Sequence, residues 1–291
     1  DRRQRQMCIR DRGMTTQELL ARARQARGAM ALADTQTKDR ALLAMAEELE
    51  ADMAPILAAN ALDLEGARGR ISEVMLDRLA LSPDRIAGMA KGIREVAALP
   101  DPVGAVLSRV ERPNGLVIEK TAVPMGVIAI IFEARPNVTV DAAALCLKSG
   151  NVCILRGGKE AIRSNRCVAE LMRQALRSVG LPEDCISLVQ DTSHETANEL
   201  MHLDGYVDVL IPRGGAGLIR AVAKEASVPV IRTGEGVCHI YIDDEADLDM
   251  GASILFNAKC SRPSVCNAVE CVLVHRDVAA DFWKKALPLL D

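Results

Sequence analysis

The sequence predicts an α/β protein built on a parallel, doubly wound sheet. From residue 124 onward, short apolar runs alternate with stretches of helical periodicity, and the connections between them are short. This repeated strand, helix, strand order is typical of parallel sheets covered on both faces. The runs are nearly all apolar, as strands buried on both sides should be. We therefore expect strands at 127–132, 152–155, 186–189, 207–211 and 228–231, with helices between them.

A helical segment precedes the sheet. Residues 15–99 carry apolar residues at helical spacing, such as Leu42 and Met45. Thr15 and Glu18 have the spacing of a capping box, so we expect the first helix to begin there.

A hairpin is expected between the helical segment and the sheet. Two β-rich runs within 103–123 flank Asn114 and Gly115, and Asn-Gly is the strongest short hairpin signal. After the sheet, a strand at 237–242, a helix at 247–258 and a β-rich segment at 269–274 are expected.

The composition excludes several classes of protein. The chain has 291 residues, which is enough for two domains, and 49% of them are hydrophobic. Its 36 Lys and Arg residues and 40 Asp and Glu residues are interspersed and give a net charge of -4, so no nucleic-acid partner is expected. No apolar run approaches the roughly 20 residues of a membrane helix, and no secretory signal pattern is present. We predict a soluble, cytoplasmic protein.

The cysteines and histidines predict free thiols and no metal site. The nine cysteines form no CxxC pair, and the four histidines supply no closely spaced ligands. An odd number of cysteines inside largely apolar runs favours a reducing compartment.

Two expected strand-to-helix turns are rich in glycine and basic residues. They comprise Arg156, Gly157, Gly158 and Lys159, and Arg213, Gly214 and Gly215. Backbone N–H groups at the start of each following helix could face phosphate oxygens, and two such turns on one parallel sheet favour a nucleotide site. The G-x-G-x-x-G fingerprint is absent, so tight turns without a ligand are the alternative. Lys159 and Arg213 suit a 2′-phosphate, and solvated surface cations are an equal alternative.

Two cysteines are candidates for a nucleophile. Cys260 and Cys266 lie in a polar segment with Ser, Arg and Asn neighbours, where exposure and positive charge favour the thiolate. Cys146, Cys153 and Cys185 lie in apolar runs and are expected to be inert packing. On the residues alone, Cys260 and Cys266 are equal candidates.

Arg135 and Asn137 follow the strand expected at 127–132 and precede a helix. This places them at the mouth of the sheet, where a side-chain amide could stabilise an oxyanion. The alternative, which residue statistics favour, is that Asn137 caps the helix.

Four motifs in order resemble the gamma-glutamyl phosphate reductases of the aldehyde dehydrogenase superfamily. They are Val-Pro-Met-Gly-Val-Ile-Ala-Ile-Ile-Phe-Glu-Ala-Arg-Pro-Asn-Val at 123–138, Ile-Leu-Arg-Gly-Gly-Lys-Glu-Ala at 154–161, Ile-Pro-Arg-Gly-Gly at 211–215 and Arg-Pro-Ser-Val-Cys-Asn-Ala at 262–268. The resemblance runs from Met14 to the last residue. It implies an aldehyde-dehydrogenase-like fold: a parallel, doubly wound cofactor sheet followed by the start of a second α/β catalytic domain.

The resemblance assigns roles to individual residues. Cys266 is implied as the nucleophile, which leaves Cys260 as a bystander, and Asn137 is implied as the oxyanion residue. Arg156, Gly157, Gly158 and Lys159 match the adenosine-phosphate side of an NADP(H) site, and Gly214 and Gly215 match the loop beneath the pyrophosphate. Arg213 is a further expected cofactor-binding residue. Arg135 and Asn267 are the expected substrate-binding residues. The family pattern has Gly where this chain has Ser264, and a residue other than Cys at 260; neither difference removes a catalytic group.

The resemblance also implies a reaction. L-glutamyl 5-phosphate would be reduced with NADPH to L-glutamate 5-semialdehyde, with release of phosphate, in proline biosynthesis. Hydrolytic aldehyde dehydrogenases carry a water-activating Glu in a Glu-Leu-Gly-Gly motif, and this chain reads Ile-Arg-Thr-Gly-Glu-Gly at 231–236 instead. The alternatives are a CoA-acylating or other non-hydrolytic aldehyde dehydrogenase and, from another class, a non-catalytic nucleotide-binding fragment.

The resemblance implies the following organisation. It comprises a non-native or disordered leader at 1–13, the helical part of the cofactor domain at 14–102, an oligomerisation hairpin at 103–123, the NADP-binding domain at 124–236 and the start of an incomplete catalytic domain at 237–291. Family members continue beyond this point, so we expect a C-terminal truncation and an inactive isolated fragment. A homo-oligomer is expected, with glutamate kinase as a further partner.

Overall fold

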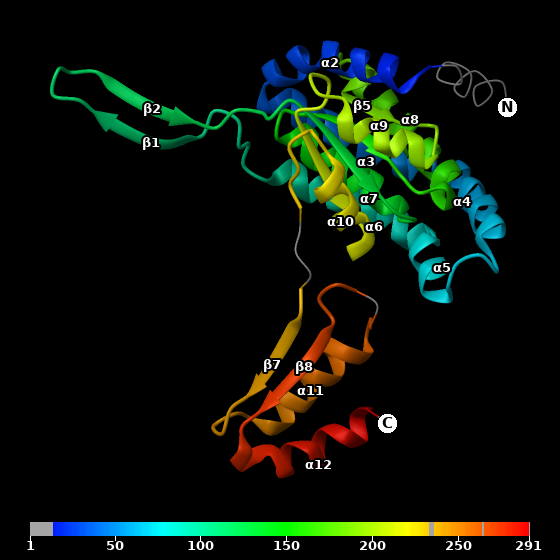
Figure 1. Ribbon diagram of the computed structural model, residues 1–291, viewed down its shortest axis with the longest axis vertical. Helices are drawn as coiled ribbons and strands as arrows, with labels where there is room; N and C mark the ends of the chain where they lie inside the picture. Colours follow the sequence, from blue (N-terminus) through cyan, green and yellow to red (C-terminus); the bar gives the residue numbers. More distant parts are fainter. Residues whose placement is uncertain (1–13, 233–235, 264, 291) are drawn as a thin grey trace. The chain divides into compact units, whose positions relative to one another are not determined.

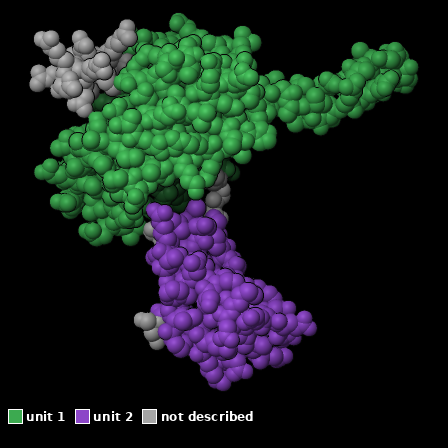
Figure 2. Space-filling model, turned by 180° about the vertical axis from the view of Figure 1, so that it is seen from behind, with its two compact units in different colours: residues 1–233 green, residues 234–291 purple. Residues whose placement is uncertain are grey.

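The computed structural model describes residues 14–232, 236–263 and 265–290 (Figure 1). The chain divides into two compact units, residues 1–233 and 234–291, which Figure 2 colours separately. The leader predicted at 1–13 and the departure at Ser264 lie outside the described residues, as do positions 233–235, which fall in the segment where the hydrolytic base is missing. None of the described helices combines the length and the apolar character needed to cross a membrane.

Five helices form the N-terminal part of the first unit. They are α2 (Thr16–Leu32), α3 (Thr35–Ala51), α4 (Met53–Ala67), α5 (Glu73–Leu79) and α6 (Pro83–Ala98). The predicted capping box is confirmed, because Glu18 N donates to Thr15 Oγ1 at 3.2 Å and Thr15 N donates to Glu18 Oε2 at 2.8 Å. Leu42 and Met45 are fully buried in the core, as their helical spacing predicts.

The predicted hairpin is present. Strand β1 (Val106–Glu111) pairs antiparallel with β2 (Val117–Thr121), and the turn between them uses Gly115 at a φ of 83°. Only glycine adopts such a φ at no steric cost, which explains the Asn-Gly pair. Every residue of both strands is exposed, and the hairpin projects from the body of its unit (Figure 1).

A four-stranded parallel sheet is the centre of the first unit. Its strands are β3 (Val127–Phe132), β4 (Val152–Arg156), β5 (Ile186–Leu188) and β6 (Val209–Arg213), in the order β5-β4-β3-β6. All six residues of β3 are buried, as its apolar sequence predicts. The strand expected at 228–231 is wrong as a full strand, since this segment makes a single parallel bridge, between Leu210 and Val230.

Helices that follow the strands of this sheet along the chain complete the α/β layers. They are α7 (Pro136–Lys148), α8 (Ile162–Ser178), α9 (His194–His202) and α10 (Ala216–Glu225). The buried apolar residues of the N-terminal helices, the sheet and these helices form one continuous core. The parallel, doubly wound class that the sequence predicts is therefore observed.

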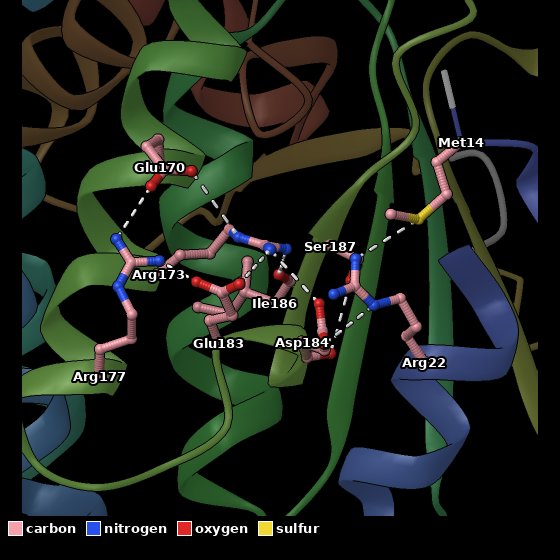
Figure 3. A network of polar contacts seen from close by, with 9 residues as sticks. All are labelled: Met14, Arg22, Glu170, Arg173, Arg177, Glu183, Asp184, Ile186 and Ser187. Atoms are coloured by element: carbon pink, nitrogen blue, oxygen red, sulfur yellow. Dashed lines mark hydrogen bonds and ion pairs between the residues drawn. The ribbon is translucent and has the colours of Figure 1, made fainter. Parts of the chain in front are cut away.

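A network of charged side chains joins α8 to the loop before β5 (Figure 3). Arg173, which is only 8% exposed, donates to Ile186 O at 3.0 Å and lies 3.3 Å from both Glu183 Oε1 and Asp184 Oδ1. Arg22 of α2 also reaches Asp184, at 3.6 Å. Several carboxylates thus share the charge of one buried guanidinium, which offsets the cost of its burial.

The second unit is a small βαβ arrangement. Strand β7 (Cys238–Ile242) runs parallel to β8 (Val269–Val274), and α11 (Leu248–Cys260) connects toward β8. Helix α12 (Ala279–Leu290) follows and buries Phe282 in the core of this unit. The strands and the helix expected here are confirmed to within about two residues, the usual uncertainty of an element's end.

Candidate active site

The strand order creates a switch point between β3 and β6. The chain adds β4 and β5 on one side of β3 and then places β6 on the other side. In open α/β sheets, ligands bind beyond the carboxyl ends of the strands at such a point. Phe132, the last residue of β3, pairs with Arg213, the last residue of β6. The segments that carry Asn137 and Gly214 therefore leave the sheet at neighbouring strand ends.

Glu133 connects these two strand ends. Gly215 N donates to Glu133 Oε1 at 3.1 Å, and a Cβ on Gly214 would lie 2.8 Å from Glu133 Cδ. A Cβ on Gly214 would therefore displace the Glu133 side chain, a contact that the sequence reasoning did not anticipate. The signal available in the sequence was the place of Glu133 directly after a buried strand.

The N-terminus of α10 is open in part. Glu133 takes the N–H of the N-cap residue, and the described part of the chain gives the first helical turn no side-chain cap. Gly215 is its N-cap residue and supplies no side-chain cap, and a Cβ at Gly217 would meet no atom within 4 Å among the described residues. Uncapped N–H groups and the positive end of the helix dipole favour an anion at this position. This helix start fits a phosphate of a dinucleotide.

The N-terminus of α8, by contrast, is already occupied by a carboxylate of the chain. Asp63, from α4, is 2% exposed and accepts hydrogen bonds from Ser164 N at 2.8 Å, Ser164 Oγ at 2.7 Å and Arg163 N at 3.3 Å. It therefore caps this helix from a distant part of the sequence. The expectation that free N–H groups of α8 face phosphate oxygens is wrong, because Asp63 already takes two of them.

We expect Asp63→Ala to lower the free energy of unfolding by about 2 kcal/mol, because the buried donors of α8 lose their acceptor. The midpoint and slope of a urea unfolding curve give this free energy. Glu65→Ala is the matched control, since Glu65 is an exposed carboxylate on the same helix, and it should change the value by less than about 0.5 kcal/mol. Equal midpoints for the two variants would contradict the capping role.

The residues of the other glycine-rich turn are held mainly by the chain itself. Arg156 Nη2 donates to Thr192 O at 2.7 Å and to Ser193 O at 2.8 Å, so its guanidinium holds the loop before α9. Burial lowers the pKa of Arg156, against the raising effect of nearby Asp191 and Glu160.

Close packing accounts for Gly157. A Cβ there would lie 2.3 Å from Nδ2 of the fully buried Asn165, whereas one on Gly158 would come closest, at 2.9 Å, to Glu160 Oε2, the end of a flexible side chain. Lys159 follows them, exposed, at the start of a short 3₁₀ helix. It is the side chain of this turn that stays open to solvent.

Asn137 lies in the first turn of α7 and is exposed. The cap residue is Arg135, in an extended conformation, and Pro136 is the first helical residue, so the alternative that Asn137 caps the helix is wrong. Asn137 Nδ2 instead donates to Asp141 Oδ2, one turn further along, at 3.3 Å. Burial raises the pKa of Asp141, and the hydrogen bond from Asn137 and the charge of Arg213 partly oppose this effect.

A pocket of about 630 Å³ opens beside Asn137's helix. Its walls are mostly apolar and come from β3, β6, one face of α7 and the root of the hairpin, and Asp141 and Arg213 are the charged residues that line it. A pocket of this size and character suits a small ligand with a few fixed polar groups. Arg135, half-buried, precedes the same helix.

Cys266 lies in the second unit, in the turns between α11 and β8, and is exposed. Cys260, the last residue of α11, is also exposed, so exposure does not separate the two candidates. Asn267 is exposed next to Cys266. The backbone carbonyl of Cys266 accepts a long hydrogen bond, of 3.6 Å, from Cys238 Sγ, a thiol that the sequence reasoning did not single out.

The cysteines predicted to be inert are buried. Cys146, Cys153 and Cys185 all lie in the core. A hydrogen bond with Cys146, together with burial, raises the pKa of Cys153, and burial raises the pKa of Cys185 to about 12. Neither Cys153 nor Cys185 forms a thiolate at neutral pH. No group of three or more metal-binding side chains gathers in the parts of the chain that the structure describes.

Comparison with known proteins adds to this geometry. The profile of the aldehyde dehydrogenase family matches residues 10–290. The chain belongs to the aldehyde dehydrogenase family. It is 54% identical, over 91% of its length, to the gamma-glutamyl phosphate reductase of Carboxydothermus hydrogenoformans. It spans 64% of that relative's length.

Solved structures agree with this assignment. The crystal structure of gamma-glutamyl phosphate reductase from Thermotoga maritima matches with a TM-score of 0.86 and 41% identity, covering 94% of this chain and 66% of that one. The Saccharomyces cerevisiae enzyme of the same name matches with a TM-score of 0.70 and 31% identity, covering 95% of this chain and 69% of that one. The predicted aldehyde-dehydrogenase-like fold and the resemblance to gamma-glutamyl phosphate reductases are confirmed.

Proposed function

We propose that this chain carries the reductase activity of its relatives: NADPH-dependent reduction of L-glutamyl 5-phosphate to L-glutamate 5-semialdehyde, with release of phosphate, as a cytoplasmic step of proline biosynthesis. The observation that carries the proposal is the 54% identity to a gamma-glutamyl phosphate reductase over 91% of the chain. The exposed Cys266 and the exposed Asn137 amide beside a pocket supply the groups that such a reaction needs.

In the proposed mechanism, the Cys266 thiolate attacks the acyl carbon of the substrate. A C–S bond forms, the bond between the acyl carbon and the phosphate oxygen breaks, and phosphate leaves. The Asn137 amide donates to the acyl oxygen as it gains negative charge, which lowers the barrier. After reduction of the thioester, the thiohemiacetal collapses to the aldehyde and regenerates the Cys266 thiol. Asn267 and Arg135 are proposed to contact the substrate.

NADP(H) is the proposed cofactor and supplies the hydride when bound. The uncapped N-terminus of α10, with Gly214 and Gly215, suits the pyrophosphate, and the exposed Lys159 suits a 2′-phosphate. Arg213 is the last residue of β6, directly before Gly214, and stays a predicted cofactor-binding residue. The N-terminus of α8 offers no second phosphate site, since Asp63 occupies it. Arg156 and Gly157 are proposed to shape the adenosine side of the site rather than to bind phosphate directly.

The reverse reaction tests the proposal. With glutamate 5-semialdehyde, NADP⁺ and inorganic phosphate, we expect NADPH formation that depends on phosphate, measured in a form of the protein that has the full length of its relatives. Coenzyme A replaces phosphate in a second arm and NAD⁺ replaces NADP⁺ in a third. Activity with coenzyme A alone would favour an acylating dehydrogenase, and cofactor binding without turnover would favour a non-catalytic module.

We also propose that the hairpin mediates self-association. Its strands are exposed at every position, and no other described strand pairs with their outer edges. Val110 pairs with Ile118 across the hairpin, and each is about half exposed, at 49% and 50%. Glutamate kinase is a further proposed partner, because it would supply the acyl phosphate.

We expect the double variant Val110→Lys, Ile118→Lys to reduce the molar mass of the protein in solution, because two charges would have to be buried at the interface. Light scattering after size-exclusion chromatography measures this mass. Leu62→Lys, another exposed apolar position at 53% exposure on α4, is the control and should keep the parental mass. A double variant that stays at the parental mass would contradict the hairpin's role.

A further inference from the structure

The pocket next to Asn137 contains two opposite charges in an apolar setting. Asp141 and Arg213 are the charged residues in its lining, and their neighbours there include Ile128, Ile130 and Ile211 of the sheet. Apolar walls strengthen the field of a charge because they exclude water from one side. A ligand that enters this pocket therefore meets one fixed negative charge and one fixed positive charge.

These two charges do not neutralise each other directly. Arg213 is close enough to lower the pKa of Asp141, yet no ion pair within 4 Å joins them among the described residues. Of the two Asp141 oxygens, Oδ2 accepts from Asn137, while Oδ1 has no hydrogen-bond partner in the described part of the chain. Partial desolvation raises the pKa of this carboxyl, although the side chain stays exposed, so its charged form is favoured less than in free solution. A cationic group on a ligand would compensate the negative charge of Asp141.

The spacing of Asn137 and Asp141 suits an amino acid activated at its far end. Their side chains leave α7 one turn apart, about 6 Å along the helix axis, and converge until Asn137 Nδ2 lies 3.3 Å from Asp141 Oδ2. In a glutamyl derivative, four bonds separate the 5-acyl carbon from the α-nitrogen, which is about 5 Å when extended. A substrate whose acyl oxygen meets the Asn137 amide thus has its ammonium group within reach of Asp141.

We propose that Asp141 binds the α-ammonium group of the substrate and thereby selects α-amino-acid derivatives over analogues that lack the amine. This inference rests on the proposed reductase function and adds the residue that sets its substrate specificity.

The test compares glutamate 5-semialdehyde with 5-oxopentanoate, which has the aldehyde and the carboxylate but no amine. The semialdehyde exists in equilibrium with its cyclic imine, so one equilibrated stock serves all variants. We expect the ratio of kcat/KM for the semialdehyde to kcat/KM for 5-oxopentanoate to fall about fivefold in Asp141→Asn, because an ion pair between the exposed Asp141 carboxylate and the ammonium is lost. Asp84→Asn, at an exposed carboxylate outside the pocket lining, is the control and should keep the parental ratio.

The choice of Asn separates specificity from positioning. An Asn side chain at 141 still offers an oxygen to Asn137 Nδ2 but carries no charge, so a residue that only orients Asn137 would lose little. We expect Asp141→Asn to fold with unchanged or higher thermal stability, since a raised carboxyl pKa costs the folded state stability as the pH rises above the unfolded pKa.

Two results would overturn the inference. An unchanged substrate ratio in Asp141→Asn, or an equal loss on both substrates, would exclude Asp141 as the ammonium site while the activity of the unsubstituted protein still supported the reductase function. No turnover of the semialdehyde by the unsubstituted protein would overturn the reductase function together with the inference.

Discussion

Cys266→Ser should lower kcat by about 10⁴-fold or more, because removal of a covalent nucleophile leaves only the contribution of substrate binding and the oxyanion site. The measurement is phosphate-dependent NADPH formation from glutamate 5-semialdehyde. The substitution replaces a sulfur by an oxygen at an exposed position, so the fold should be unchanged. Circular dichroism checks this.

Cys260→Ser is the matched control for the nucleophile. Both thiols are exposed and lie six positions apart in the same segment of the second unit, so a general effect of thiol loss would appear in both variants. We expect Cys260→Ser to stay within about threefold of the parental kcat, the size of an ordinary surface effect. Loss of activity in Cys260→Ser with activity retained in Cys266→Ser would show that the nucleophile is Cys260.

Asn137→Ala should lower kcat by about 10²- to 10³-fold with little change in KM, since the amide is proposed to act on charge that develops only in the transition state. Asn137 is exposed in the first turn of α7, and its side chain donates to Asp141 in the described part of the chain, so stability should hardly change. Asn198→Ala, an exposed asparagine on α9, is the control. A KM effect without a kcat effect would assign Asn137 to substrate binding instead.

Local signals in the sequence predicted the elements well. The capping box at Thr15, the Asn-Gly turn that ends at Gly115 and the uninterrupted apolar run of β3 all depend on neighbours within a few residues, and each is observed. The strand expected at 228–231 failed because only Val230 finds a partner, on Leu210. Whether an apolar run pairs as a strand is decided by the adjacent strand and not by the run itself.

The candidate site was predictable only in part. The sequence located Asn137, but residue statistics favoured a capping role for it. That role is wrong because Pro136, with its fixed φ, is the first helical residue and Arg135 is the cap. The hydrogen bonds from the N-terminus of α8 to Asp63 join residues about 100 positions apart, and no local pattern predicts such a contact.

The nucleophile shows a different limit of local reasoning. Cys260 and Cys266 are equal by residue context and by exposure. The motif around Cys266 is what distinguishes them, so this assignment rests on the family.

The most direct test of the account is to isolate the acyl-enzyme. Glutamate 5-semialdehyde and NADP⁺ are supplied without phosphate to a form of the protein at the full length of its relatives. The thiol adds to the aldehyde, the adduct is oxidised, and the thioester accumulates because no acceptor is present. We expect peptide mass spectrometry to find one glutamyl group on Cys266, which phosphate then removes. A glutamyl group on Cys260, or NADPH formation without any acylated cysteine, would contradict the account.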